Sequence, residues 1–166
     1  WDEAFSYTVS AELLKAAEVI INDGGTEQNN DQGSNWQGAR GSAGGLALLA
    51  TDHVYGSGLE DSAWGRVQRY LNAAYAGSGW LSEGTGYFYF PVGDYIAPYG
   101  VALSREQPWR DLRDYPAFRN AFWAAIAANV PTTRPFGWPG VKPDFSNDGP
   151  AIGGEGVYGL GFVFAP

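Results

Sequence analysis

The stretch that decides the fold runs over residues 34–51 and reads SNWQGARGSAGGLALLAT. Ser34 is expected to cap a helix over this whole stretch, because a serine side chain can accept a hydrogen bond from the first helical turn. Gly38, Gly41 and Gly45 recur on one face, although each glycine costs about 1 kcal/mol against alanine inside a helix. Either close packing of another backbone, the commoner cause, or close approach of a ligand must offset this cost.

Upstream, residues 1–22 are expected to form a helix, because apolar residues recur there at three-to-four spacing. The recurring residues are Phe5, Val9, Leu13, Ala16 and Ile20. The run Asn22-Asp23-Gly24-Gly25 is expected to stop this helix, since glycine takes the left-handed conformation of a C-cap without strain. The polar residues 23–33 are expected to form a loop.

Downstream, the pattern predicts three more helices, over 61–76, 91–103 and 114–129. The inner face of the first is expected to carry Trp64, Val67, Leu71 and Ala74. Pro91 fits the first turn of the second helix, which Pro98 is expected to kink. Asp114 is expected to cap the third, with Pro116 at its first helical position.

Five helical segments without a hairpin or a βαβ rhythm predict an all-α chain. Long loops rich in Gly, Pro and aromatic residues favour a toroid or solenoid of helical hairpins over a simple bundle. We therefore expect residues 1–166 to form a single, partial α/α-toroid domain. Its helical part covers 1–129, its Pro/Gly-rich loop region 130–156, and the start of a further element 157–166.

Composition excludes several kinds of partner. The chain has 10 Lys and Arg residues against 18 Asp and Glu residues, and this net charge of −8 argues against nucleic acid. No run of 18 apolar residues is present, so no membrane span is expected. No cysteine is present, which excludes disulfides and thiolate metal sites. Aromatic residues make up 16% of the chain, and their rings either fill the core or stack on sugars.

The chain begins with Trp1 and contains no methionine. We therefore expect a mature or trimmed piece of a longer chain, with the remainder of that chain as one of its partners. The absence of cysteine fits an exported protein without disulfides, either secreted or periplasmic.

Two motifs carry a resemblance to a known family. The first is Ser34-Asn35-Trp36-Gln37, followed by the small-residue helix, and the second spans 79–87 and reads GWLSEGTGY, followed by aromatic residues. Together with the Gly/Asp-rich stretch 142–149, they resemble the N-terminal α/α-toroid of heparinase II/III-like and alginate-lyase-like polysaccharide lyases. The similarity covers about residues 34–150, which is less than a complete toroid, and the β-sandwich partner domain of that family has no counterpart in this chain.

The resemblance implies β-elimination from a uronate-containing polysaccharide or oligosaccharide. A base must remove the C5 proton while another group neutralises the carboxylate. The family pattern places Tyr87 as base or acid, with Tyr89 in reserve, and Asn35 as neutraliser. Arg40 follows Asn35 by five residues, a little over one helical turn, and suits a carboxylate, because its guanidinium pairs with both oxygens. Substrate contacts are expected from Trp36, Gln37, Trp80 and Glu83.

The family usually supplies a catalytic histidine, and the one histidine of this chain is His53. It lies at the expected end of the 34–51 helix, where a histidine commonly acts as a capping cation. Catalysis by His53 and capping by His53 both remain open.

No cofactor is required, but one stretch has the spacing of a calcium loop. Its ligand positions would be Asp144, Ser146, Asp148 and Glu155. The flanks hold Pro143 and glycines instead of helices, which argues against an EF-hand. A calcium loop of another kind and a solvated acidic loop remain open.

Three functions follow from the sequence as hypotheses. The first is a polysaccharide lyase, the second a glycoside hydrolase of the same architecture, and the third a non-catalytic module that binds glycan or only scaffolds a larger assembly. Sequence gives no separation between carboxylates, so a hydrolytic pair cannot be chosen from it.

Overall fold

A computed structural model describes residues 2–23, 33–51, 58–75 and 90–121. Within these ranges every regular element is helical, which confirms the all-α class. The elements are α1 (Glu3–Asn22), α3 (Asn35–Leu49), α4 (Leu59–Tyr75), the π-helix η2 (Val92–Ile96), α5 (Ala97–Glu106) and the 3-10 helix η3 (Leu112–Asp114). None of the helices in this part of the chain is long and apolar enough to cross a membrane.

Some predicted segments lie outside the described residues. They are the second half of the helix predicted at 114–129, the aromatic motif 79–87, the loop region 130–156 and the element starting at 157. The described ranges therefore contain one half of the motif pair on which the family resemblance depends.

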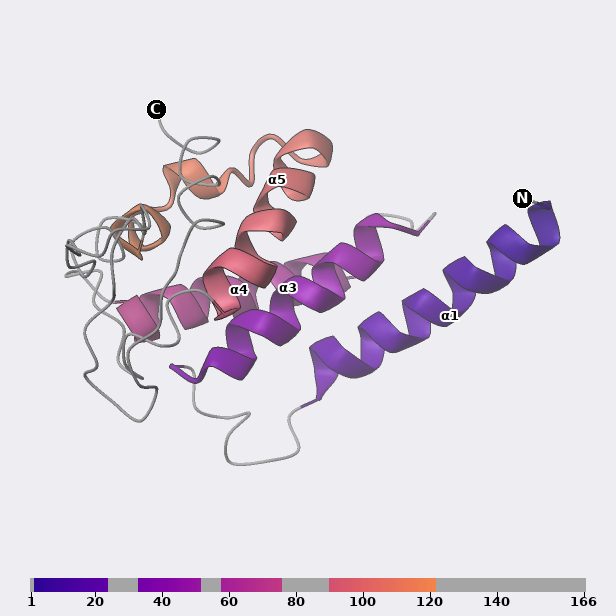
Figure 1. Ribbon diagram of the computed structural model, residues 1–166, viewed down its shortest axis with the longest axis horizontal. Helices are drawn as coiled ribbons and strands as arrows, with labels where there is room; N and C mark the ends of the chain where they lie inside the picture. The colour runs from indigo at the N-terminus through magenta and orange to yellow at the C-terminus, as the bar shows by residue number, and fades with distance from the viewer. Residues whose placement is uncertain (1, 24–32, 52–57, 76–89, 122–166) are drawn as a thin grey trace, which may run out of the picture.

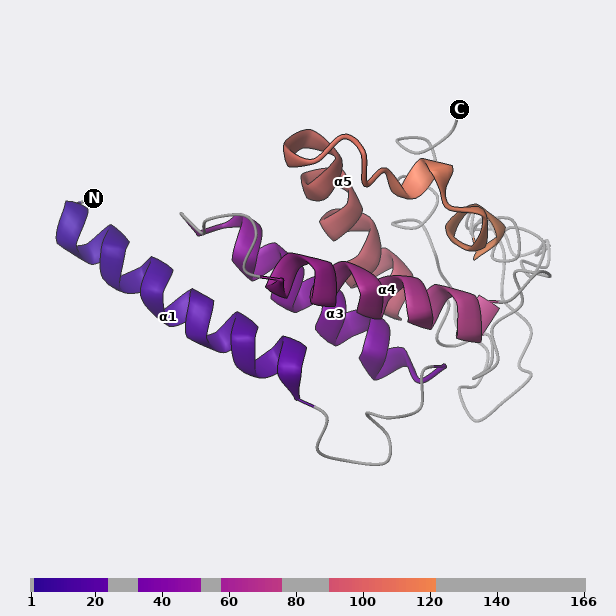
Figure 2. The same ribbon diagram turned by 180° about the vertical axis from the view of Figure 1, so that it is seen from behind.

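Helix α3 is the centre of the described part. It packs against α1 on one side, against α4 on another, and against η2 and α5 on a third. Figures 1 and 2 show α3 between α1 and α5 from both sides, with α4 running close beside it. The first half of α1 projects beyond the other helices, with the N-terminus at its far end (Figure 1). The main core lies between α4, η2 and α5, and its largest fully buried side chains are Tyr70, Tyr75, Tyr99, Phe118 and Leu71.

The glycines of α3 let its neighbours approach closely. A Cβ atom added at Gly38 would lie 2.5 Å from Cδ1 of Tyr70, and one added at Gly45 would lie 2.4 Å from Cε2 of Tyr99. Tyr70 belongs to α4 and Tyr99 to α5, and both rings are buried. The tyrosine rings therefore occupy the space that ordinary side chains would take.

Gly41 and Gly44 of α3 allow similarly close contacts with α4 and α1. A Cβ at Gly41 would lie 3.1 Å from the backbone oxygen of Ala63 in α4. A Cβ at Gly44 would lie 2.5 Å from Cγ1 of Ile21 in α1. Close packing is thus the reason for the glycines, and the space beside them holds side chains and backbone of this chain.

The predicted helix at residues 1–22 is confirmed, and it ends at Asn22 with Asp23 as the C-cap. However, its packed face is offset by one residue from the predicted recurrence. Ala17 and Ile21 are buried, and Leu14 packs beside them. Phe5 and Val9 are 49% and 40% exposed, because they lie in the half of α1 that extends past its neighbours.

The helix predicted at 91–103 is present, but its first part is π-helical and only its second part is α-helical. Its π-helical turn Val92–Ile96 precedes α5, which runs to Glu106 and so ends later than predicted. Pro98 has no backbone N–H and cannot complete an ordinary turn. The N–H of Ala97 instead donates to the carbonyl of Val92, which is the wider π spacing. Pro98 thus lies directly after a widened turn, in the first turn of α5, and the predicted kink there stays a prediction.

The predicted cap at Asp114 is wrong. Asp114 is the last residue of η3, and the carbonyl of Tyr115 accepts the first bonds of the helix at 116–121, from Phe118 and Arg119. Pro116 does occupy the first helical position. The aspartate that caps is Asp111, which starts η3.

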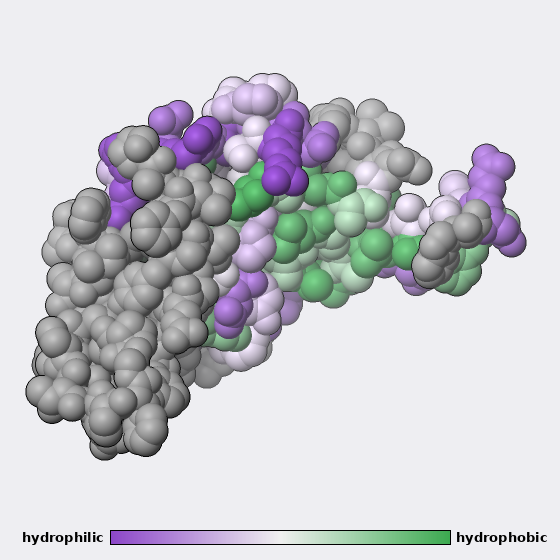
Figure 3. Space-filling view, turned by 45° about the horizontal axis from the view of Figure 1, so that its top comes forward, coloured by the Kyte–Doolittle hydropathy of each residue, from purple (hydrophilic) through white to green (hydrophobic). Residues whose placement is uncertain are grey.

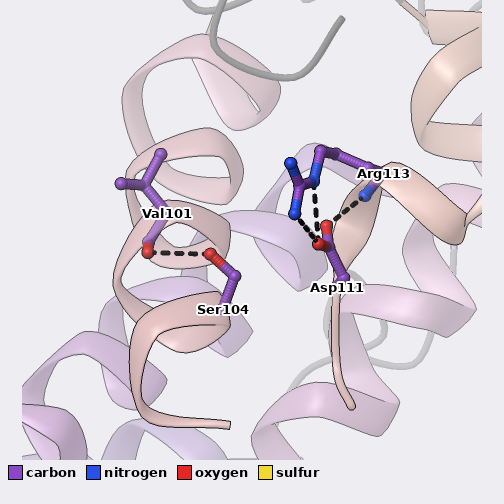
Figure 4. A network of polar contacts seen from close by, with 4 residues as sticks. All are labelled: Val101, Ser104, Asp111 and Arg113. Atoms are coloured by element: carbon purple, nitrogen blue, oxygen red, sulfur yellow. Dashed lines mark hydrogen bonds and ion pairs between the residues drawn. The ribbon is translucent and has the colours of Figure 1, made fainter. Parts of the chain in front are cut away.

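Asp111 also holds the segment after α5 in place. Its carboxylate accepts hydrogen bonds from the backbone N–H of Arg113 at 2.8 Å and from its Nε at 2.7 Å (Figure 4). Hydrogen bonding from the Arg113 side chain lowers the pKa of the Asp111 carboxyl. Beside it, in α5, Ser104 donates to the carbonyl of Val101 at 3.1 Å.

Substituting Gly45 by alanine should lower the free energy of unfolding by up to about 2 kcal/mol, because overpacking against Tyr99 costs about 1–3 kcal/mol and better helix propensity offsets about 1 kcal/mol of this. Gly65→Ala in α4 is the matched control. Its Cβ would meet only Nη1 of Arg69, at 3.2 Å, which is the end of a flexible side chain. This variant should be more stable than the wild type by about 0.5–1 kcal/mol. Urea unfolding measures both, and equal effects of the two substitutions would contradict the packing argument.

Candidate functional site

Four of the predicted site residues lie in the first two turns of α3. Trp36 is 48% exposed, whereas Asn35 and Gln37 are 6% and 5% exposed. Arg40 is partly exposed. The exposed side chains of this helix start are therefore those of Trp36 and Arg40, and the roles assigned to Asn35 and Gln37 remain predictions. The other predicted site residues lie outside the described residues: His53, Trp80, Glu83, Tyr87 and Tyr89, with the calcium candidates Asp144, Ser146, Asp148 and Glu155.

Trp36 and Arg40 lie one above the other on α3, because residues four apart share a helix face. The guanidinium carbon of Arg40 is 5.8 Å from the centroid of the Trp36 ring. This is within the range of a cation–π contact. The cation and the indole therefore form one composite surface, which we call the Trp36–Arg40 platform.

Two further aromatic rings continue from the platform in a chain of edge-to-face contacts. Phe90 meets Trp36 edge-on, with centroids 6.0 Å apart, and Tyr95 meets Phe90 in the same way at 5.3 Å. Phe90 lies two residues before the η2 segment and Tyr95 lies within it. The π-helical turn thus lies where these rings reach α3. Edge-to-face contacts of this kind hold the indole of Trp36 in a defined orientation.

Arg40 is also held from the side by Asp23, the C-cap residue of α1. Nη1 of Arg40 lies 2.9 Å from Oδ2 of Asp23. Both side chains are partly open to solvent, with 28% of Arg40 and 41% of Asp23 exposed. The sequence analysis placed Asp23 only in a helix stop. The available signal was a lone acid at the end of one helix and a lone cation in the next, which does not specify a pairing.

Arg66 of α4 binds the end of α1 at the place where Asp23 pairs with Arg40, which we call the α1–α3 junction. Its Nη1 donates to the carbonyl of Ile20 and its Nη2 to that of Asp23, both at 3.0 Å. These carbonyls end α1, so Arg66 caps the helix and neutralises the negative end of its dipole. Sequence reasoning also missed Arg66.

The junction is electrostatically positive. Burial lowers the pKa of the Arg66 guanidinium, and the positive charges of Arg40 and Arg69 lower it further, whereas Asp23 raises it. Arginine keeps its proton through such shifts because its ordinary pKa is so high. Two guanidinium groups, those of Arg40 and Arg66, and one carboxylate therefore meet at the end of α1, in a chain whose net charge is −8.

In the described ranges no group of three His, Cys, Asp or Glu residues is arranged to hold a metal ion. What the Trp36–Arg40 platform offers is a flat, partly exposed ring next to a guanidinium. A sugar ring can stack on such an indole through its apolar C–H face. A carboxylate on that sugar can take both oxygens to the guanidinium fork.

Comparisons with protein-family models, with curated proteins and with solved structures each return no match to this chain. The resemblance to polysaccharide lyases therefore stays an expectation based on two motifs.

Replacing Arg66 by methionine should destabilise the protein by about 1–3 kcal/mol, because two partly buried carbonyls lose charged donors. The loss should be concentrated at the end of α1, where amide hydrogen exchange of the last turn should accelerate. Arg69→Met is the matched control, since Arg69 lies on the same helix and is exposed. It should change stability by less than about 0.5 kcal/mol. Equal losses in the two variants would remove Arg66 from its capping role.

Proposed function

We propose that this chain binds a uronate-containing glycan at the Trp36–Arg40 platform, as part of a polysaccharide-lyase-like protein with α/α-toroid architecture. The observation that carries the proposal is the half-exposed indole of Trp36 with a guanidinium 5.8 Å from its ring centre. The indole matches the face of a sugar ring, and the guanidinium matches a sugar carboxylate.

The rigidity of the platform supports binding. Trp36 is held by Phe90, and Arg40 is held by both Trp36 and Asp23. Side chains that are already ordered lose little conformational entropy when a ligand arrives. A free surface tryptophan or arginine would lose more, so the contacts beneath the platform contribute to affinity without touching the glycan.

The proposed reaction is β-elimination. A base takes the C5 proton of the uronate, the C4–O bond breaks, and the departing oxygen takes a proton. Neutralising the carboxylate makes the C5 proton more acidic, and Arg40 supplies a suitable positive charge for this. The family resemblance gives the base or acid role to Tyr87, which remains a proposal.

The direct test incubates the protein with a panel of uronate polysaccharides and follows ultraviolet absorbance. Growth of the unsaturated-uronate signal supports elimination. Release of saturated sugars without that signal supports the hydrolase, and binding without any product supports the non-catalytic module.

Changing Tyr87 to phenylalanine should abolish the unsaturated-uronate signal while the circular dichroism spectrum stays unchanged, because only one hydroxyl is removed. Tyr89→Phe is the control for the loss of a neighbouring hydroxyl and should retain most activity. Full activity of Tyr87→Phe would exclude this residue as base or acid.

Changing Trp36 to alanine should weaken uronate-glycan binding about tenfold, corresponding to about 1.4 kcal/mol of lost stacking. Trp109→Ala is the matched control, because Trp109 is 76% exposed and lies away from the platform. Arg110, next to Trp109, is paired with Asp61 in the first turn of α4. Trp36 lies near the other end of α4, because Gly38, two residues after it, meets Tyr70 there. Isothermal titration with a uronate oligosaccharide measures both variants, and equal weakening by the two would contradict a site at Trp36.

A further inference from the structure

The proposed function assigns the guanidinium of Arg40 to the ligand, but in this structure Asp23 already pairs with that guanidinium. Nη1 of Arg40 donates to Oδ2 of Asp23 at 2.9 Å. A ligand carboxylate that approaches Arg40 therefore meets a carboxylate of the protein already in place. Two carboxylates beside one guanidinium repel one another, so binding requires an exchange.

The structure makes such an exchange feasible at Asp23. The side chain is 41% exposed, so water can solvate its carboxylate when Arg40 turns to a ligand. The backbone of the same residue is fixed independently. Its N–H donates to the carbonyl of Val19, and its carbonyl accepts from Arg66. The carboxylate can therefore move while the end of α1 stays where it is.

We propose that Asp23 is the displaceable counter-ion of Arg40 and limits the affinity for uronates: it holds the guanidinium in the free protein and yields this place only to a ligand that brings its own carboxylate. This inference rests on the proposed glycan site. A neutral sugar cannot replace the charge that Arg40 would lose, so it leaves the ion pair intact and gains only stacking on Trp36. A uronate gains both contacts, but its binding free energy is reduced by the cost of displacing Asp23.

The role of Arg66 follows from the same geometry. By holding the carbonyls of Ile20 and Asp23, it keeps the resident carboxylate within reach of Arg40. Arg66 therefore acts as a positioning residue, and its charge also strengthens the positive potential that a ligand carboxylate meets.

The test titrates the protein with glucuronate, galacturonate and mannuronate, each compared with the uncharged sugar glucose, galactose or mannose. Binding is followed through the indole N–H of Trp36 and the Nε–H of Arg40 in nitrogen–proton spectra, assigned with Trp36→Phe and Arg40→Lys. Asp23→Asn removes the charge and keeps the shape and the backbone bonds. It should tighten binding of the uronate about fivefold, since it removes a competing ion pair and a like charge. Binding of the neutral sugar should stay within about twofold of the wild type, because stacking is unchanged.

Two control variants make the result specific. Glu12→Gln removes the same charge from the same helix, where Glu12 pairs with Lys15 on the surface. It lies eleven residues, or about 16 Å of helix, from Asp23, which is beyond the screening length at physiological salt. It should leave both affinities unchanged. Asp23→Glu restores the carboxylate and should return uronate affinity toward that of the wild type.

Each outcome is decisive. If the wild type binds uronates and Asp23→Asn binds them equally well or more weakly, Asp23 does not act as a displaceable counter-ion. If Glu12→Gln tightens binding as much as Asp23→Asn, the effect is one of overall charge and the inference is overturned. If no variant shifts the Trp36 and Arg40 signals with any uronate, the proposed glycan site itself is wrong, and the inference falls with it.

Discussion

The described structure depends on the close contact between the small-residue surface of α3 and the tyrosine rings beside it. Tyr70 and Tyr99 lie where a Cβ at Gly38 or Gly45 would have to be. Because a close-packed interior leaves no slack for an added methyl group, these contacts fix how near α4 and α5 come to α3. Glycine lowers the intrinsic stability of the helix, and packing across the two interfaces offsets that loss. On the face shown in Figure 3, hydrophobic residues also form a continuous area across the middle of the described part.

The same contact builds the candidate site from pieces far apart in the chain. Gly44 lets Ile21 approach, which brings the end of α1 against α3, and Gly41 lets α4 approach from the other side. Asp23 and Arg66 consequently reach Arg40 from two different helices. Phe90 arrives on a third segment, just before the π-helical turn. The platform is therefore a consequence of the packing of α3 and needs no special loop among the described residues.

Features that depend on interactions within one segment could be predicted from the sequence, whereas features that depend on how segments meet could not. The helix over 34–51, which the structure places at Asn35–Leu49, and the inner face of α4, with Val67 and Leu71, were predicted correctly, because helical periodicity is encoded within one segment. Ser34 does occupy the N-cap position, but its side chain makes no capping hydrogen bond. The packed face of α1 was not, since Phe5 and Val9 have the right spacing but extend past the helices that could cover them. The ion pair of Asp23 with Arg40 was missed because its formation depends on how two helices meet, which no local pattern specifies.

The acidic charge of the chain and its positive junction favour different ligands at different distances. Charges beyond about 8 Å are largely screened at physiological salt, so a small ligand at Arg40 experiences mainly the nearby guanidinium groups and Asp23. A nucleic acid carries a phosphate at every step and would extend from the junction over the acidic surface, where each further phosphate is repelled. A glycan with separated carboxylates can place one at Arg40 and keep neutral hydroxyls elsewhere. Net charge therefore argues against densely charged polymers, while the guanidinium of Arg40 favours an acidic over a neutral sugar and Asp23 competes with that sugar for it.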